Sequence, residues 1–174
     1  MTTATLPPAA LTASPLRTSA ARWRGGVEFQ VRRANEGDAP ALAALSRPFV
    51  HAGALRERPL SLYVSRASEF LVAQAPDGTL EGGLGLSQHA ADGVLYNFCV
   101  AAHRQGSGLG GRLLQAAFSR ARGRALTRLF TATTGSGRLF LGHGFVPSRS
   151  DLAPAAWART LDSGRNARVL ARTL

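Results

Sequence analysis

A chain of 174 residues is long enough for one domain with a sizeable core, and its only cysteine, Cys99, excludes an internal disulfide and a multi-cysteine metal site. No run of about 18 uncharged apolar residues occurs, so the sequence predicts no membrane span, and a cytoplasmic location is the default. All 21 basic residues are arginines, and twelve of them lie in residues 93–174 against two acidic residues, a local net charge of +10 that favours anionic ligands.

The basic half of the chain raises the question of nucleic-acid binding. Arginine-rich nucleic-acid sites usually contain stacking aromatic side chains or a recognisable docking element, and the sequence shows neither. The four histidines show no metal-ligand spacing. We therefore expect a small anionic ligand, no nucleic acid, no membrane and no metal.

The N-terminal segment, residues 1–26, is rich in Ala, Thr, Ser and Pro and contains no acidic residue. It lacks the unbroken apolar core of a secretory signal peptide. Its composition fits a disordered tail at least as well as an organelle transit peptide. We therefore expect a single folded domain over residues 27–174.

The first half of this domain predicts strands and helices in alternation. Residues 27–34 alternate as a strand does, and residues 37–49 place apolar side chains at helical spacing. Asp38 is the predicted N-cap of that helix, with Pro40 in its first turn. Residues 58–67 predict a second, shorter helix.

A hairpin and a glycine-rich junction follow. The Asp-Gly turn at 76–79 joins strands predicted over 69–75 and 80–89. Another strand is predicted over 93–102, and it runs into a helix over 108–123 that a glycine ends. The strands up to this point form an antiparallel meander.

The last third predicts a strand over 126–134, a short helix over 136–144 with Ser136 as its cap, a strand beginning at 145–147 and a final strand over 166–174. No internal repeat or linker divides the domain. The order of elements predicts a mixed α/β domain of the α+β type with one crossover near its middle.

The stretch HRQGSGLGGRLL, residues 103–114, is the sharpest functional signal in the chain. Glycine permits positive φ and close approach, and a strand–loop–helix junction directs free amides toward an anion. The partial positive charge of the helix N-terminus adds to this effect. The stretch therefore predicts a diphosphate site, with a glycine-rich turn that binds nothing as the alternative.

Two common phosphate motifs do not account for this stretch. A Walker loop needs a lysine, and the chain has none. GSGLGG, residues 106–111, satisfies the dinucleotide-binding pattern, but no acidic residue lies between Asp92 and Asp151. The preceding meander is also unlike the start of a doubly wound sheet.

The pattern Gln/Arg-x-x-Gly-x-Gly/Ala after a strand that ends in valine resembles the acetyl-CoA loop of the GNAT N-acetyltransferases. QGSGLG fits it, and Gly144 and Phe145 match a Gly-Phe pair that recurs in the family. The resemblance covers residues 27–174 and implies the GNAT fold, a mixed central sheet of about six to seven strands with a splayed pair and flanking helices. It implies acetyl-CoA as co-substrate, held by Cys99, Val100, Gln105, Gly106, Ser107, Gly108, Leu109 and Gly110.

Three further stretches, GALRERP, LFTATTGSGRLFLGHGF and RNARVLARTL, are similar to the acetyltransferase domains of the N-acetylglutamate synthases. This resemblance implies acetylation of the α-amino group of an amino acid, L-glutamate, for arginine biosynthesis. The sequence shows no amino-acid-kinase-like domain, so we expect no arginine feedback through one. The resemblance implies an acceptor site formed by Arg56, Arg58, Thr133, Ser136, Arg165 and Arg168.

The proton-transfer groups are less defined. Phe140 stands where many GNAT enzymes carry a tyrosine general acid. Asn97 stands where such synthases often carry a cysteine, and it could orient the amine but not act as a base. Cys99 could protonate the leaving thiolate, with a small buried apolar role as its alternative. Removal of the amine proton by water is our default.

Two other functions stay open from the sequence. One is a GNAT enzyme that acts on another small amine or a peptide N-terminus, although the positive charge argues against cationic amines such as polyamines. The other is a basic module that binds nucleic acid or protein. A homodimer is also left open.

Overall fold

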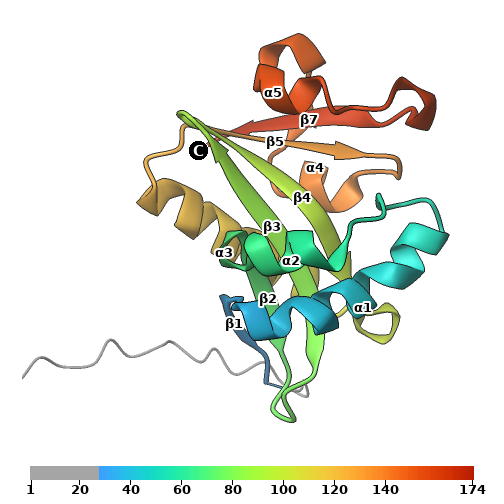
Figure 1. Ribbon diagram of the computed structural model, residues 1–174. Coiled ribbons are helices and arrows are strands. Elements are labelled where there is room, and N and C mark those ends of the chain that lie inside the picture. The colour runs from blue at the N-terminus through green and yellow to red at the C-terminus, as the bar shows by residue number, and fades with distance from the viewer. Residues whose placement is uncertain (1–27) are drawn as a thin grey trace, which may run out of the picture.

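The computed structural model describes residues 28–174 (Figure 1), so the tail predicted over 1–26 and Val27 lie outside the described residues. Seven strands form one sheet in the order β1-β2-β3-β4-β5-β7-β6. No helix in this range has the length and apolar character needed to cross a membrane. The strands are β1 Gln30–Arg33, β2 Phe70–Gln74, β3 Leu80–His89, β4 Asp92–Val100, β5 Arg128–Thr133, β6 Val146–Pro147 and β7 Arg168–Thr173. The helices are α1 Ala39–His51, α2 Leu60–Ser65, α3 Leu109–Gly123, α4 Arg138–Gly142 and α5 Ala155–Ala158.

The predicted fold class is confirmed. All strands pair antiparallel except β4 and β5, which are parallel and are joined by the crossover through α3. The predicted elements are all present and differ mainly at their ends. The sequence patterns did not predict α5, which has only four residues and therefore no helical period to detect.

Asp38 is the N-cap residue of α1, as predicted, but it does not cap the helix with its side chain. Instead Oδ1 and Oδ2 each accept from Arg32 at 2.8 Å, and Oδ2 also accepts from the Asn35 amide at 2.8 Å. Asn35 caps the short turn before α1, because its Oδ1 accepts from the Gly37 amide. The Asp38 carboxylate therefore binds Arg32 of β1 and the Asn35 amide rather than the amides of α1.

Side chains pack against both faces of the sheet. On one face lies α3, whose apolar side recurs at helical spacing and fills the largest core cluster with side chains from β2, β3 and β4. On the opposite face, α1 and α2 cover one region and α5 covers another, as Figure 1 shows. These two regions belong to separate core clusters, so the face between them is not filled by a helix.

The strands β4 and β5 separate partway along their length. Their parallel pairing ends at Val94 and Phe130. Beyond this point β4 contains a bulge, since Tyr96 pairs with Gly85 whereas Cys99 pairs with Gly83, which leaves one extra residue on β4. The splayed pair that the resemblance implied is therefore present, and it opens a gap in the centre of the sheet.

Candidate functional site

The bulge in β4 is fixed by Asn97. Its backbone has φ +50°, the left-handed region that asparagine tolerates better than most residues. Its side chain is buried, and Nδ2 donates to Ser46 Oγ at 2.9 Å while Oδ1 accepts from the Tyr63 hydroxyl at 3.5 Å. The Ser46 hydroxyl donates in turn to the Leu42 carbonyl at 2.8 Å. These bonds tie the bulge to α1.

Two cavities flank this bulge. Residues 94–97 of β4 line the first, of about 510 Å³, which lies between α2 and α5 and is called here the arginine cavity. Residues 98–100 line the second, of about 480 Å³, which reaches the start of α3 and is called the glycine cavity. One strand therefore supplies a wall to each cavity, and the two walls join at the bulge.

Two of the six loop amides predicted to hold a diphosphate are bonded within the loop itself. The Gln105 amide donates to the Ala102 carbonyl at 3.3 Å, and the Ser107 amide donates to the Arg104 carbonyl at 3.2 Å. The Ser107 hydroxyl donates to the same Arg104 carbonyl at 2.6 Å. In this conformation these groups shape the turn.

The other four amides of the predicted set belong to Gly106, Gly108, Leu109 and Gly110. Within the part of the chain that the structure describes, none of them donates to a backbone carbonyl. Gly106 and Gly108 have φ +78° and +83°, a conformation that glycine adopts without strain. A Cβ on Gly110 would lie 2.9 Å from the Leu139 side chain, which would have to shift to admit a larger residue. The loop thus keeps a cluster of unused donors.

Of the two β4 residues that the resemblance implies hold acetyl-CoA, Cys99 and Val100, only Val100 directs its backbone amide toward the gap. The Ala101 amide donates to the Glu81 carbonyl on β3, and successive residues of a strand direct their amides to opposite edges. The Val100 amide therefore points away from β3 and the Cys99 amide toward it. The Val100 carbonyl lies on the same edge and accepts from Gln105 Nε2 at 3.3 Å.

The thiol of Cys99 is buried, with Sγ 3.9 Å from Ser46 Oγ. Burial raises the pKa of this thiol to about 11, although Ser46 lowers it in part. Cys99 therefore keeps its proton at neutral pH. Giving that proton to an ordinary thiolate, of pKa about 8.5, is uphill. The raised pKa of Cys99 therefore favours its alternative role as a small buried apolar side chain.

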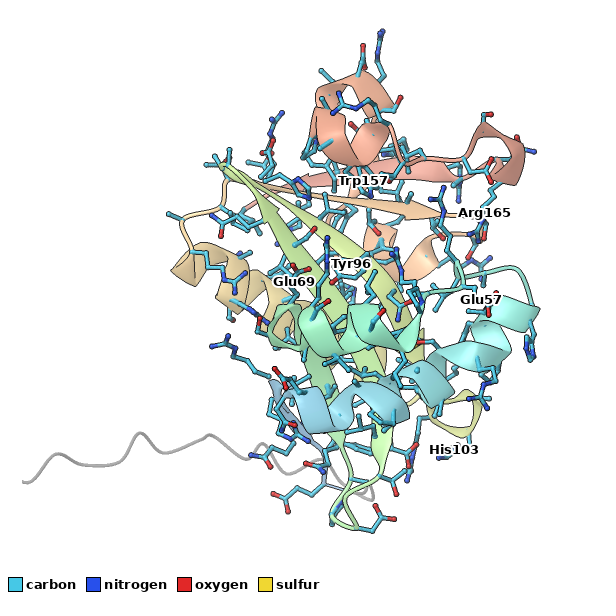
Figure 2. All side chains as sticks on the ribbon, in the orientation of Figure 1. Glu57, Glu69, Tyr96, His103, Trp157 and Arg165 are labelled. Carbon is cyan, nitrogen blue, oxygen red and sulfur yellow. The ribbon has the colours of Figure 1, made fainter. Side chains whose placement is uncertain are left out.

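The arginine cavity is lined by Arg56, Arg58, Arg66 and Arg165, and Asp162 is the only carboxylate among its lining residues. The Asp162 carboxylate is already engaged in its own turn. Figure 2 shows Arg165, Trp157 and Tyr96 around the space between α2 and α5. The cavity therefore has a strongly positive wall, which suits an anionic ligand.

Arg58 and Arg165 are held differently. Arg165 Nη2 donates to the Gly53 carbonyl at 2.6 Å, which joins the loop before β7 to the segment between α1 and α2. Arg58 is half-buried, its buried Nε has no hydrogen-bond partner in the described residues, and burial lowers the pKa of its guanidinium. Arg58 is thus a desolvated cation whose donors remain available.

Three predicted acceptor residues line neither cavity. Thr133 Oγ1 accepts from the Gly135 amide at 3.2 Å, and Ser136 Oγ accepts from the Arg138 amide at 3.5 Å. Arg168 Nη2 donates to the carbonyls of Gly135 and Ser136 at 3.0 and 2.7 Å. These side chains fold the turn between β5 and α4. Thr134, which is not among the predicted acceptor residues, lines the arginine cavity.

Several aromatic residues of the site were not predicted. Tyr96 and Trp157 line the arginine cavity, and Phe49 and Phe98 line the glycine cavity. A signal was available for Tyr96, which is adjacent to the predicted Asn97. Phe140 packs edge-on against Phe98, with ring centroids 5.7 Å apart, so it supplies no proton donor at this point.

Comparisons with known proteins identify the family of this chain. Residues 66–147 match the family model described as an acetyltransferase (GNAT) domain. The amino-acid acetyltransferase of Neisseria meningitidis serogroup A is 35% identical over 147 residues, covering 83% of this chain and 34% of the relative. That of Ralstonia nicotianae is 32% identical over 146 residues, with shares of 83% and 32%. The chain spans about a third of the length of these relatives.

A solved structure has the same fold. It is N-acetylglutamate synthase from Neisseria gonorrhoeae complexed with coenzyme A and N-acetyl-glutamate, with a TM-score of 0.80 and 33% identity. The alignment covers 86% of this chain and 36% of that one. The similarity therefore extends beyond the general fold to related sequence.

The hydrogen bonds of Asn97 predict the effect of its replacement. Asn97→Ala removes the partner of a buried hydroxyl and puts a strained residue at positive φ, so we expect a loss of about 2–3 kcal/mol in the free energy of unfolding. Asn97→Gly loses the same bonds without the strain and should lose about 1 kcal/mol less. Denaturant unfolding measures both, and equal losses would show that φ is not strained.

The buried thiol predicts a pH-dependent stability difference. Because the folded-state pKa of about 11 exceeds the unfolded value near 8.5, the contribution of Cys99 is complete below pH 8.5 and is lost as pH rises toward 11. Relative to Cys99→Ala, the wild-type chain should lose about 2 kcal/mol of unfolding free energy between pH 8 and pH 10. A difference that does not change with pH would place the thiol in contact with water.

Proposed function

Because this chain carries an acetyltransferase domain of the GNAT family, we propose that it transfers the acetyl group of acetyl-CoA to the α-amino group of an amino acid, with L-glutamate as the acceptor. The observation that carries the proposal is the junction of two cavity walls at the bulge of β4, one cavity with unused amides and the other lined by arginines. Acyl transfer benefits from such a junction, since its two reactants arrive from separate sites.

The glycine cavity suits the coenzyme. Unused amides at the start of the 15-residue helix α3 fit a diphosphate, because the N–H groups and the helix dipole both favour negative charge. Phe49, Phe98 and Leu139 provide an apolar wall for the chain between diphosphate and thioester. The Val100 amide, on the same cavity, would donate to the carbonyl oxygen of the thioester as negative charge develops.

The arginine cavity suits an acceptor with two carboxylates. Arg58 and Arg165 are half-buried guanidinium groups, whose planar shape binds carboxylates through two parallel hydrogen bonds. Arg56 and Arg66 add positive charge to the wall and would repel a polyamine. The relative from Neisseria gonorrhoeae was solved with N-acetyl-glutamate, the acetylated form of the acceptor proposed here.

The thioester supplies an activated acetyl group, and the chain's residues bring an uncharged amine to it. Asn97 lies at the junction with Nδ2 committed to Ser46, so Oδ1 is the atom that can accept a hydrogen bond from the amine. Asn97 and Phe140 cannot move a proton, and Cys99 holds its proton tightly. We therefore assign removal of the amine proton to water.

A charge placed in the glycine cavity tests the coenzyme site. Gly108→Glu puts a carboxylate beside the unused amides, and we expect acetyl-CoA affinity to fall at least a hundredfold in a calorimetric titration. Gly123→Glu adds the same charge at the opposite end of α3, where nothing lies within 4 Å of a Cβ, and should bind normally. Gly108→Ala introduces the same backbone strain without the charge, so its affinity shows how much of the loss in Gly108→Glu is due to the charge. Unchanged affinity in Gly108→Glu would contradict the coenzyme site.

Removal of a cavity arginine tests the acceptor site. Arg58→Ala deletes charge-assisted hydrogen bonds, so the KM for glutamate should rise about 10- to 100-fold while the KM for acetyl-CoA stays within twofold. Thiol release from acetyl-CoA gives both values. Arg47→Ala, an exposed arginine that lines neither cavity, is the matched control. If both constants rise equally in Arg58→Ala, Arg58 does not contact the acceptor.

A further inference from the structure

We propose that Tyr96 is the positioning residue of the acceptor site, where the face of its ring holds Arg58 in place. The Arg58 Cζ atom lies 5.3 Å from the centroid of the Tyr96 ring, and both residues line the arginine cavity. The inference rests on the proposed function, in which Arg58 binds a carboxylate of the acceptor. It explains what holds Arg58 in place before a carboxylate of the acceptor binds.

A half-buried cation needs stabilisation from its surroundings. None of the ion pairs formed by residues 28–174 includes Arg58, and its buried Nε has no hydrogen-bond partner there. An acidic neighbour would stabilise the charge but would also occupy the donors. An aromatic face attracts the cation through its quadrupole and leaves every N–H free. Tyr96 therefore stabilises Arg58 without consuming the groups that a substrate carboxylate needs.

The ring of Tyr96 is itself fixed from three sides. Gly85 lies opposite Tyr96 on β3, and a Cβ there would be 2.6 Å from the ring, so the ring lies flat over the strand only because this residue is glycine. Phe70 packs edge-on, with ring centroids 5.3 Å apart. The Tyr96 hydroxyl donates to Glu69 Oε2 at 2.6 Å. The ring thus has one orientation, which fixes the plane that Arg58 covers.

Glu69 takes no direct part in binding Arg58. Its Oε2 accepts from Tyr96 and lies 3.8 Å from Arg66 Nη1. Figure 2 shows Glu69 beside Tyr96, and Glu69 does not line the arginine cavity. The carboxylate and burial together raise the pKa of the Tyr96 hydroxyl, which keeps the ring neutral. Glu69 therefore orients the ring and leaves the acceptor side of the cavity positively charged.

The experiment compares KM values for glutamate and acetyl-CoA in four variants. Tyr96→Leu removes the aromatic face, and we expect the KM for glutamate to rise about tenfold while that for acetyl-CoA stays within twofold. Tyr96→Phe keeps the face and should restore most of the affinity. Gly85→Ala keeps the tyrosine but displaces its ring, so it should raise the KM for glutamate as Tyr96→Leu does. It takes the place of Tyr96→Leu in the comparison if Tyr96→Leu fails to fold.

The fourth variant, Phe130→Leu, is the matched control. The Phe130 ring lies 5.3 Å from Arg128 Cζ, the same distance as in the Tyr96 pair, but Phe130 lines neither cavity. It should lower the melting temperature without separating the two KM values. A rise in Tyr96→Phe equal to that in Tyr96→Leu would overturn the proposal, because the hydroxyl would then be the functional group.

Arg58→Ala, measured in the same series, separates two kinds of failure. If it raises the KM for glutamate while Tyr96→Leu and Gly85→Ala do not, the positioning role of Tyr96 is wrong and the acceptor site stands. If none of the three raises that KM, Arg58 does not bind the acceptor, and the proposed site itself is wrong. A KM that rises equally for both substrates in Tyr96→Leu would indicate a general structural effect and would also overturn the positioning role.

Discussion

The bulge at Asn97 is the constraint on which the rest of the site depends. A regular β4 would continue its pairing with β5 past Val94, and the sheet would have no central gap. The extra residue turns β4 away from its neighbour, directs residues 94–97 and 98–100 to different cavities and leaves the Val100 amide facing the gap. Buried hydrogen bonds from Asn97 to α1 and α2 keep this irregular backbone in place.

Both cavities contain polar groups that have no hydrogen-bond partner among residues 28–174 and that a ligand can use. In the glycine cavity the unused groups are amides, kept accessible by glycines. In the arginine cavity the unused group is the guanidinium of Arg58, stabilised by the face of Tyr96. The two cavities are alike in one respect. In each, the groups that would bind a ligand are held in place, and no other group fills the positions that the ligand would take.

The local parts of the site could be predicted from the sequence, and the tertiary parts could not. Residues 105–110 predict an anion site, because the spacing of glycines and the start of a helix can both be recognised in adjacent residues. Arg58 and Arg165 followed from a family resemblance, since a surface arginine and a site arginine look alike in one sequence. Thr133 and Arg168 matched the same resemblance, yet they fold a turn here. Tyr96 is adjacent to the predicted Asn97, but the orientation of its ring depends on Gly85 and Phe70, its partners across the sheet.

The most direct test of the account is a crystal structure of the protein with coenzyme A and N-acetyl-glutamate bound together. We predict that the diphosphate lies on the amides of Gly106, Gly108, Leu109 and Gly110, and that the acetyl oxygen lies within hydrogen-bond distance of the Val100 amide. The two ligands should meet beside Asn97. A diphosphate bound elsewhere, or an acetyl group remote from the bulge, would contradict the account.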